Sequence, residues 1–191
     1  MNCDYPDIAA LLEQLRDEYA EGCDSDLGDR DLPTTERDTV AEIRCRLQTL
    51  FRGRDVNVHC EVKPAPSHDA QPDQLKRLPR VDIVLLTDRE GASWFKSAKD
   101  IQARYRKGSI EARFASVPVE FFHTAIEVKI QSNVCDAKRD IDTLVSIIRS
   151  NPRCNGFLVL LNARGRPQDH AAIAAYGQER CIHVVEYTAQ T

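Results

Sequence analysis

The chain has 191 residues, of which 42% are hydrophobic and 29% are charged, as in an ordinary globular protein with one main domain. It has no apolar run of the roughly 20 residues that a membrane-spanning helix requires, so we expect no such helix. The net charge of −4 is unevenly spread: residues 1–31 carry ten acidic and two basic side chains, whereas residues 32–191 carry 24 basic and 20 acidic ones. The mildly basic main part of the chain permits a polyanionic partner.

The cysteines and the N-terminal segment indicate the compartment. The seven cysteines are scattered, and no two have the C-x-x-C spacing of zinc or redox motifs. The acidic N-terminal segment has neither the basic region nor the apolar region of a secretory signal. We therefore expect reduced thiols in a cytoplasmic protein.

Apolar residues at helical spacing first occur over residues 7–20, and an Asp- and Gly-rich stretch follows them. This pattern predicts an acidic N-terminal helix and linker over residues 1–33, ahead of a main domain over residues 34–191. The main domain opens with a second helix, which Thr34 or Thr35 can cap.

Strand patterns and further helix patterns fill the rest of the main domain. Three strand patterns come in succession, and two helix-strand pairs follow. An antiparallel meander followed by parallel crossovers is therefore expected, which gives an α/β fold with a mixed β-sheet flanked by helices. A long connection around residues 89–120 looks like an insertion. The expected strands are 56–63, 80–88, 124–131, 156–162 and 181–187, and the expected helices are 135–151 and 169–179.

Charged residues interrupt two of the apolar strand patterns. Glu127, Lys129 and Gln131 share one face of their strand, because successive side chains alternate. Asp82 is a lone acid in the preceding strand, on the face of Val84. A charge buried without a partner costs several kcal/mol, and two neighbouring carboxylates need a cation to relieve their repulsion. The pattern predicts either an internal ion pair or an oxygen-lined site of the kind that suits Mg²⁺ or Mn²⁺.

The helix before these strands supplies a further acid. At about 100° per residue, Glu36 lies close to the centre of the stripe formed by Val40, Ile43 and Leu47. Glu36 is therefore the candidate for a third carboxylate that looks into the sheet. Glu42 points to the side of that stripe and is the second choice.

This order of a helical acid, Asp82 and the Glu127-Val128-Lys129 triplet resembles the PD-(D/E)XK nuclease superfamily, also called restriction-endonuclease-like. The resemblance covers residues 34–187 at the level of element order, and it implies a restriction-endonuclease-like α-β-β-β-α-β core. Two features depart from the family pattern. Pro79 stands three residues before Asp82 instead of directly before it, and the stretch between Asp82 and Glu127 is longer than in compact members.

The resemblance implies a role for each residue of the motif. Asp82 and Glu127 would hold one or two Mg²⁺ (or Mn²⁺) ions, helped by the backbone carbonyl of Val128. Lys129 would orient or activate the attacking water. Glu36 would complete a metal site, directly or through water. The metal would stabilise charge on the phosphate and lower the pKa of its bound water.

Basic side chains near the motif are candidates for nucleic-acid contacts, because they neutralise phosphates. Residues 94–108 interleave such bases with aromatics that can stack on nucleobases, although an amphipathic helix with solvated charges accounts for the same pattern. Gln131 shares the strand face of Lys129. Lys138 and Arg139 begin the next helix, where a solvated helix start is the alternative. The candidates in 94–108 are Lys96, Lys99, Arg104, Arg106 and Lys107.

The sequence thus predicts a Mg²⁺-dependent nuclease, either an endonuclease or an exonuclease, that hydrolyses phosphodiester bonds in nucleic acid, with DNA as the expected substrate. The resemblance implies restriction, defence or mobile-element processing as its setting. No separate DNA-reading module is visible, so sequence specificity would come from the insertion, a homodimer or a partner protein.

Two alternatives remain open at this point. The chain could keep the nuclease fold without turnover and serve as a subunit that binds nucleic acid or assembles with a partner protein. It could also regulate a partner through its amphipathic N-terminal helix. The acidic N-terminal segment itself could pack against the core or shield the basic face.

Overall fold

The structure is a computed structural model, and it describes residues 5–24, 35–54, 56–65, 79–86, 116–130, 133–161 and 166–187. The helices are α1 (Tyr5–Asp24), α2 (Glu36–Leu50), α4 (Val134–Ser150) and α5 (Pro167–Gln178), and η3 (Val119–Phe121) is a 3-10 helix. The strands are β1 (Asn57–Ala65), β2 (Val81–Leu86), β3 (Ser116–Pro118), β4 (Phe122–Ile130), β5 (Asn155–Leu161) and β6 (His183–Tyr187).

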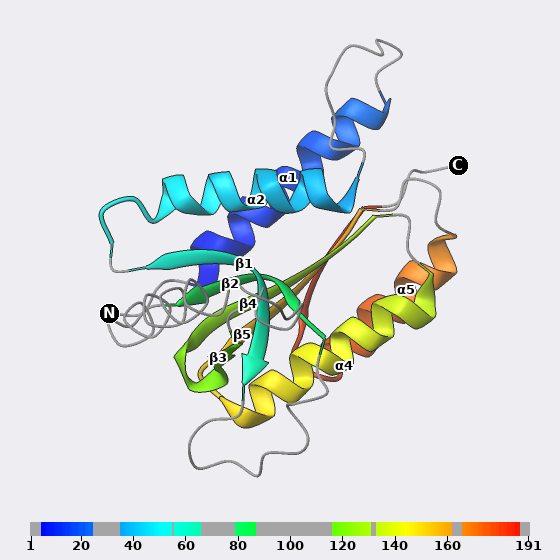
Figure 1. Ribbon diagram of the computed structural model, residues 1–191. Coiled ribbons are helices and arrows are strands. Elements are labelled where there is room, and N and C mark those ends of the chain that lie inside the picture. Colours follow the sequence, from blue (N-terminus) through cyan, green and yellow to red (C-terminus); the bar gives the residue numbers. More distant parts are fainter. Residues whose placement is uncertain are drawn as a thin grey trace, which may run out of the picture.

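The six strands form one mixed sheet in the order β3-β1-β2-β4-β5-β6 (Figure 1). β1, β2 and β4 form an antiparallel meander, and β5 and β6 add in parallel through α4 and α5. The expected α/β class and the α-β-β-β-α-β core are therefore confirmed. The short strand β3, parallel to β1, has no counterpart in the expectation, because three residues ending in proline carry no alternation to detect.

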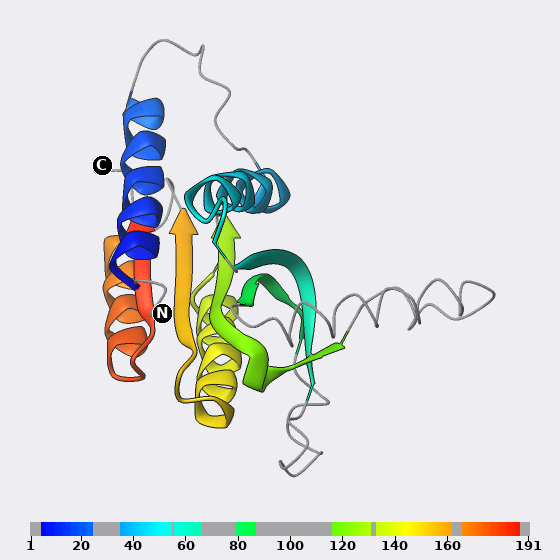
Figure 2. The same cartoon turned by 90° about the vertical axis from the view of Figure 1, so that its left-hand side faces the viewer.

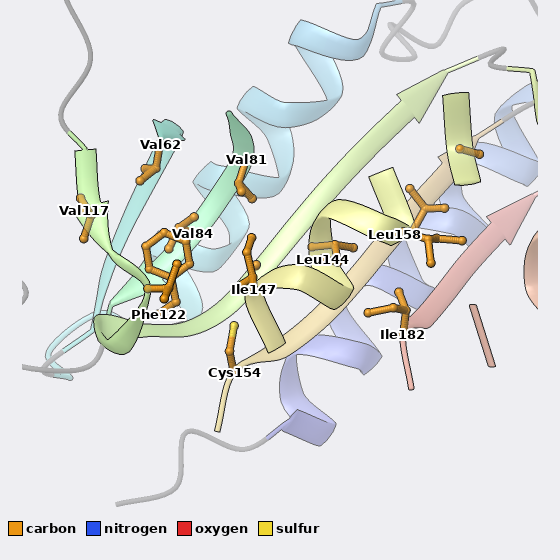
Figure 3. Close-up of a cluster of buried hydrophobic side chains, with 14 of the residues drawn as sticks. Val62, Val81, Val84, Val117, Phe122, Leu144, Ile147, Cys154, Leu158 and Ile182 are labelled. Carbon is orange, nitrogen blue, oxygen red and sulfur yellow. The ribbon is translucent and has the colours of Figure 1, made fainter. Parts of the chain in front are cut away.

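Helices cover both faces of the sheet (Figure 2). α1 and α2 pack on one face and enclose a cluster of buried apolar side chains, here called the α1–α2 core. α4 and α5 pack on the other face over a second cluster, here called the α4–α5 core (Figure 3). No helix in the part of the chain that the structure describes is long and apolar enough to cross a membrane.

Helix α1 is anchored in the α1–α2 core. Ile8, Leu12, Leu15 and Tyr19 recur at helical spacing and are buried against β5 and β6. The ring of Tyr19 meets that of Tyr187 on β6 edge to face, with the centroids 5.6 Å apart. Because each buried Leu or Ile side chain stabilises the fold by roughly 1.5–3 kcal/mol, the described part of the acidic segment is held firmly against the sheet.

The regular alternation of side chains breaks in β2 next to Asp82. Ile83 faces the α1–α2 core as expected, but Val81 packs with Val84 in the α4–α5 core (Figure 3). Strict alternation along the strand predicts that Val81 points away from Val84, and this prediction is wrong. The break coincides with a φ of 55° at Glu61 of β1, the residue that the strand register sets opposite Asp82. Such a left-handed φ is uncommon outside glycine, and it marks the backbone beside Asp82 as irregular.

Asn151 joins the end of α4 to the segment that enters β4. Its side-chain amide, which is buried, donates hydrogen bonds to the carbonyls of Val119 and Phe122 at 2.9 and 2.8 Å. We expect Asn151→Ala to lower the free energy of unfolding by about 1–3 kcal/mol, because the buried carbonyls lose their donor. Urea unfolding measures this effect. Ser150→Ala, an exposed neighbour, should change the free energy by less than about 0.5 kcal/mol, and equal effects would contradict the assignment.

Candidate active site

The predicted acids meet where β2 and β4 separate. The ladder between these strands ends at the pair Ile83 and Ile126, and one further step in the same register sets Asp82 opposite Glu127. Beyond the last pair, Oδ2 of Asp82 accepts a hydrogen bond from the backbone N–H of Val128 at 2.7 Å. This bond holds the Asp82 side chain, which is only 9% exposed, in the gap between the strands.

Glu127 is the most deeply buried acid of the group, at 2% exposure, and its Oε1 has no hydrogen-bond partner among the described residues. Burial raises its pKa well above the usual value, and the like charges of Asp82 and Asp140 raise it further. Burial also raises the pKa of Asp82, although the N–H of Val128 opposes the shift. A hydrogen bond joins the two carboxyl groups, so without a cation the pair favours holding a proton.

Lys129 is the centre of an ion-pair network. Its Nζ lies 3.2 Å from Oε1 of Glu36 and 3.3 Å from Oδ2 of Asp140, and it donates a hydrogen bond of 3.1 Å to the carbonyl of Val128. Burial alone lowers the pKa of Lys129, but the surrounding carboxylates, led by Asp140 and Asp82, outweigh burial and raise it above its usual value. The side chain is therefore an ammonium ion at neutral pH.

Glu36 comes from α2, on the opposite face of the sheet from α4. It is the first residue of that helix, after Thr35, whose hydroxyl accepts a hydrogen bond from the backbone N–H of Asp38. The Glu36 side chain is 45% exposed and contacts Lys129 over the end of β4. The second-choice acid, Glu42, does not approach this cluster and forms an ion pair with Arg46 at 2.6 Å.

Asp140 of α4 is the member of the cluster that the sequence analysis missed. Its side chain is only 13% exposed, and burial raises its pKa while Lys129 opposes that shift. The sequence did hold a signal. Asp140 stands three residues after Ala137 and four before Leu144, both of which are buried, so helical spacing places it on the buried side, as it did for Glu36.

The predicted nucleic-acid contacts are only partly described. Lys138 lies over the ring of Tyr176, 4.9 Å from its centroid, and Arg139 forms an exposed ion pair with Asp136 at 3.4 Å. Neither joins the cluster around Lys129. The other candidates, Gln131, Lys96, Lys99, Arg104, Arg106 and Lys107, lie outside the described residues.

The donors at the strand gap suit a divalent cation. The unpartnered oxygen of Glu127 is buried beside the Asp82 carboxyl, and a cation there would relieve the repulsion that raises both pKa values. Within the residues that the structure describes, no three His, Cys, Asp or Glu side chains are grouped to hold a metal ion. Mg²⁺ commonly uses one or two carboxylates and completes its shell with water, so Asp82 and Glu127, with the Val128 carbonyl, fit it without a third side chain.

The element order and the strand order define an α/β protein with the α-β-β-β-α-β core that the resemblance implies. No protein-family model and no curated protein sequence matches the chain. Among solved structures, the chain is similar to P. aeruginosa ATCC27853 NucC in its cAAA-bound form, with 13% identity, 88% of this chain and 72% of that chain covered, and a TM-score of 0.46. A likeness this distant does not carry over a site, an activity or a ligand.

Proposed function

We propose that the chain is a metal-dependent endonuclease that hydrolyses phosphodiester bonds, with DNA as its substrate. One observation carries the proposal: Asp82, Glu127 and Lys129 converge at the point where β2 and β4 separate. Two buried carboxyl groups beside an ammonium ion are costly to a fold that does not use them. Their coexistence with an unpartnered buried oxygen is best explained by a cation and a phosphate.

The chain's own residues would share the work as follows. A bound Mg²⁺ ion would stabilise charge on the phosphate and make a bound water more acidic. Asp82, oriented by the Val128 N–H, and Glu127, through its unpartnered Oε1, would hold that ion. Lys129 would place its positive charge where negative charge develops on the phosphate in the transition state.

The protonation of Lys129 narrows its role. In the metal-free protein the surrounding carboxylates outweigh burial and raise the pKa of Lys129, so its ammonium group keeps its proton at neutral pH. This favours the orienting and charge-stabilising role over the role of a base. Glu36 and Asp140, which hold Nζ from two sides, are positioning residues for it.

The direct test is a cleavage assay with plasmid, linear duplex, single-stranded DNA and RNA, each with Mg²⁺, Mn²⁺ or a chelator. Loss of an ion-holding carboxylate should remove several kcal/mol of transition-state stabilisation, so Asp82→Asn should slow cleavage by about 10²–10⁴-fold. Glu120→Gln removes an exposed acid from η3 and should leave cleavage unchanged. Two results together would contradict the proposal: cleavage by the wild type in chelator, and cleavage by Asp82→Asn at the wild-type rate.

The second candidate is a nuclease-fold subunit that binds nucleic acid without turnover. It is favoured by the lack of a third metal-binding side chain among the described residues and by the engagement of Lys129 with two carboxylates. Binding of DNA with no cleavage under any metal, unchanged in Asp82→Asn, would select this candidate.

A further inference from the structure

One flank of α2 carries two arginines with no assigned role. Arg37 and Arg44 stand seven residues apart, which is two helical turns, so they lie on the same side of the helix. Both are exposed, and neither has an ion-pair partner among the described residues. The buried residues Ile43 and Leu47 point between this flank and the opposite one, toward the sheet.

The opposite flank of the same helix shows what a structural arginine looks like in this protein. Arg46 donates to Glu18 of α1 at 2.7 Å and to Glu42 at 2.6 Å, so its charge is neutralised and ties α2 to α1. Arg37 and Arg44 form no such ion pairs among the described residues. Their positive charges face outward on the side of α2 that overhangs β1.

Both arginines are close to the candidate active site. Arg37 follows Glu36, whose carboxylate contacts Lys129. Arg44 is on the helix that packs against β1, where burial raises the pKa of the Cys60 thiol, the charge of Arg44 lowers it and the charge of Asp82 raises it. The flank therefore begins beside Glu36, which contacts Lys129 at the end of β4, and belongs to a helix that packs against β1, β2 and β4.

Two acids of the neighbouring structure are paired with other cations. Glu61 of β1 lies 3.6 Å from Arg80, and Glu36 lies 3.2 Å from Lys129. The positive charge of Arg37 and Arg44 is thus left for a ligand outside the described part of the chain.

We propose that Arg37 and Arg44 bind the phosphate backbone of the nucleic-acid strand beside the scissile phosphate. Seven helical residues span about 10 Å, so the two long side chains can reach nearby phosphates of one strand, whose negative charges attract them. The two guanidinium groups would thus contact two phosphates of that strand and set its register at Lys129. Such contacts position the strand without reading its sequence. The inference rests on the proposed function for the identity of the ligand.

The test measures binding of a short fluorescein-labelled DNA duplex to the full chain by anisotropy, in chelator, over a series of salt concentrations. The double variant Arg37→Ala/Arg44→Ala should weaken binding about tenfold or more and reduce the slope of log affinity against log salt by about 1 for each arginine. Arg149→Ala/Arg153→Ala makes the same charge change at the far end of α4, where β5 begins, and should leave affinity and slope close to wild type. Melting temperatures of both variants should match wild type.

The outcomes separate this inference from the proposed function. Equal affinity and slope in the two double variants would overturn the role of the α2 flank, even if the protein cleaves DNA. Arginine-dependent binding without cleavage by any form of the protein would support the flank and overturn the nuclease proposal. A wild-type chain with no affinity for the duplex would overturn the role of the α2 flank, whereas the nuclease proposal would still stand or fall on the cleavage assay in Mg²⁺.

Discussion

Replacing Lys129 by methionine is expected to slow DNA cleavage by about 10²–10³-fold, the usual cost of removing one preorganised group that stabilises transition-state charge. The effect should fall on kcat more than on KM, because the interaction strengthens as charge develops on the phosphate. Single-turnover cleavage in Mg²⁺ measures it. Lys129→Arg, which keeps the charge, should recover part of the rate.

Lys129 also neutralises its neighbours, so its removal has a second consequence. Glu36, Asp140 and the Asp82–Glu127 pair would be left without their common cation. We expect a loss of about 1–3 kcal/mol in the free energy of unfolding at neutral pH, smaller than for a fully buried pair because Glu36 is half-exposed. Lys63→Met, at an exposed lysine of β1, is the control for both the cleavage rate and the free energy of unfolding. If a folded Lys129→Met protein cleaved DNA at the wild-type rate, Lys129 would have no role in catalysis.

Glu127→Gln is expected to stabilise the metal-free protein at neutral pH while abolishing metal-dependent cleavage. The folded-state pKa of Glu127 is raised above its ordinary value of 4.5, first by burial and then by Asp82 and Asp140. Its contribution to stability is therefore fully present below about pH 4.5 and is lost as the pH rises through the raised value. Glutamine resembles the protonated form at every pH, so the variant should gain about 1–3 kcal/mol at pH 8 and little at pH 4.

Urea unfolding in chelator at the two pH values measures this gain, with Glu120→Gln as the exposed control. Added Mg²⁺ should stabilise the wild type by mass action but should stabilise Glu127→Gln much less. A stability difference between Glu127→Gln and wild type that does not change between pH 4 and pH 8 would show that Glu127 is not a strained carboxylate.

The sequence alone was enough for the order of the described elements apart from β3 and η3, and for the faces of the central strand β4. Alternation placed Glu127 and Lys129 on one side of β4, and the stripe of Ile43 and Leu47 pointed Glu36 toward the sheet, where it contacts Lys129. These are local signals, because a side chain's direction depends on the period of its own helix or strand. Helical spacing gave the same signal for Asp140. The family motif does not include an acid at that position, so the residue was not predicted.

Contacts between distant parts of the chain were decided by the tertiary structure. The bond from Val128 to Asp82 joins residues 46 apart, and that from Lys129 to Glu36 joins residues 93 apart. The turn of Val81 into the α4–α5 core follows an irregular backbone at Glu61, which strict alternation does not foresee. The pKa values of these side chains depend on their burial and on the charges of their neighbours. Burial and neighbouring charges arise only when β2, β4, α2 and α4 pack together. The periodicity of one element carries no information about its distance from another element.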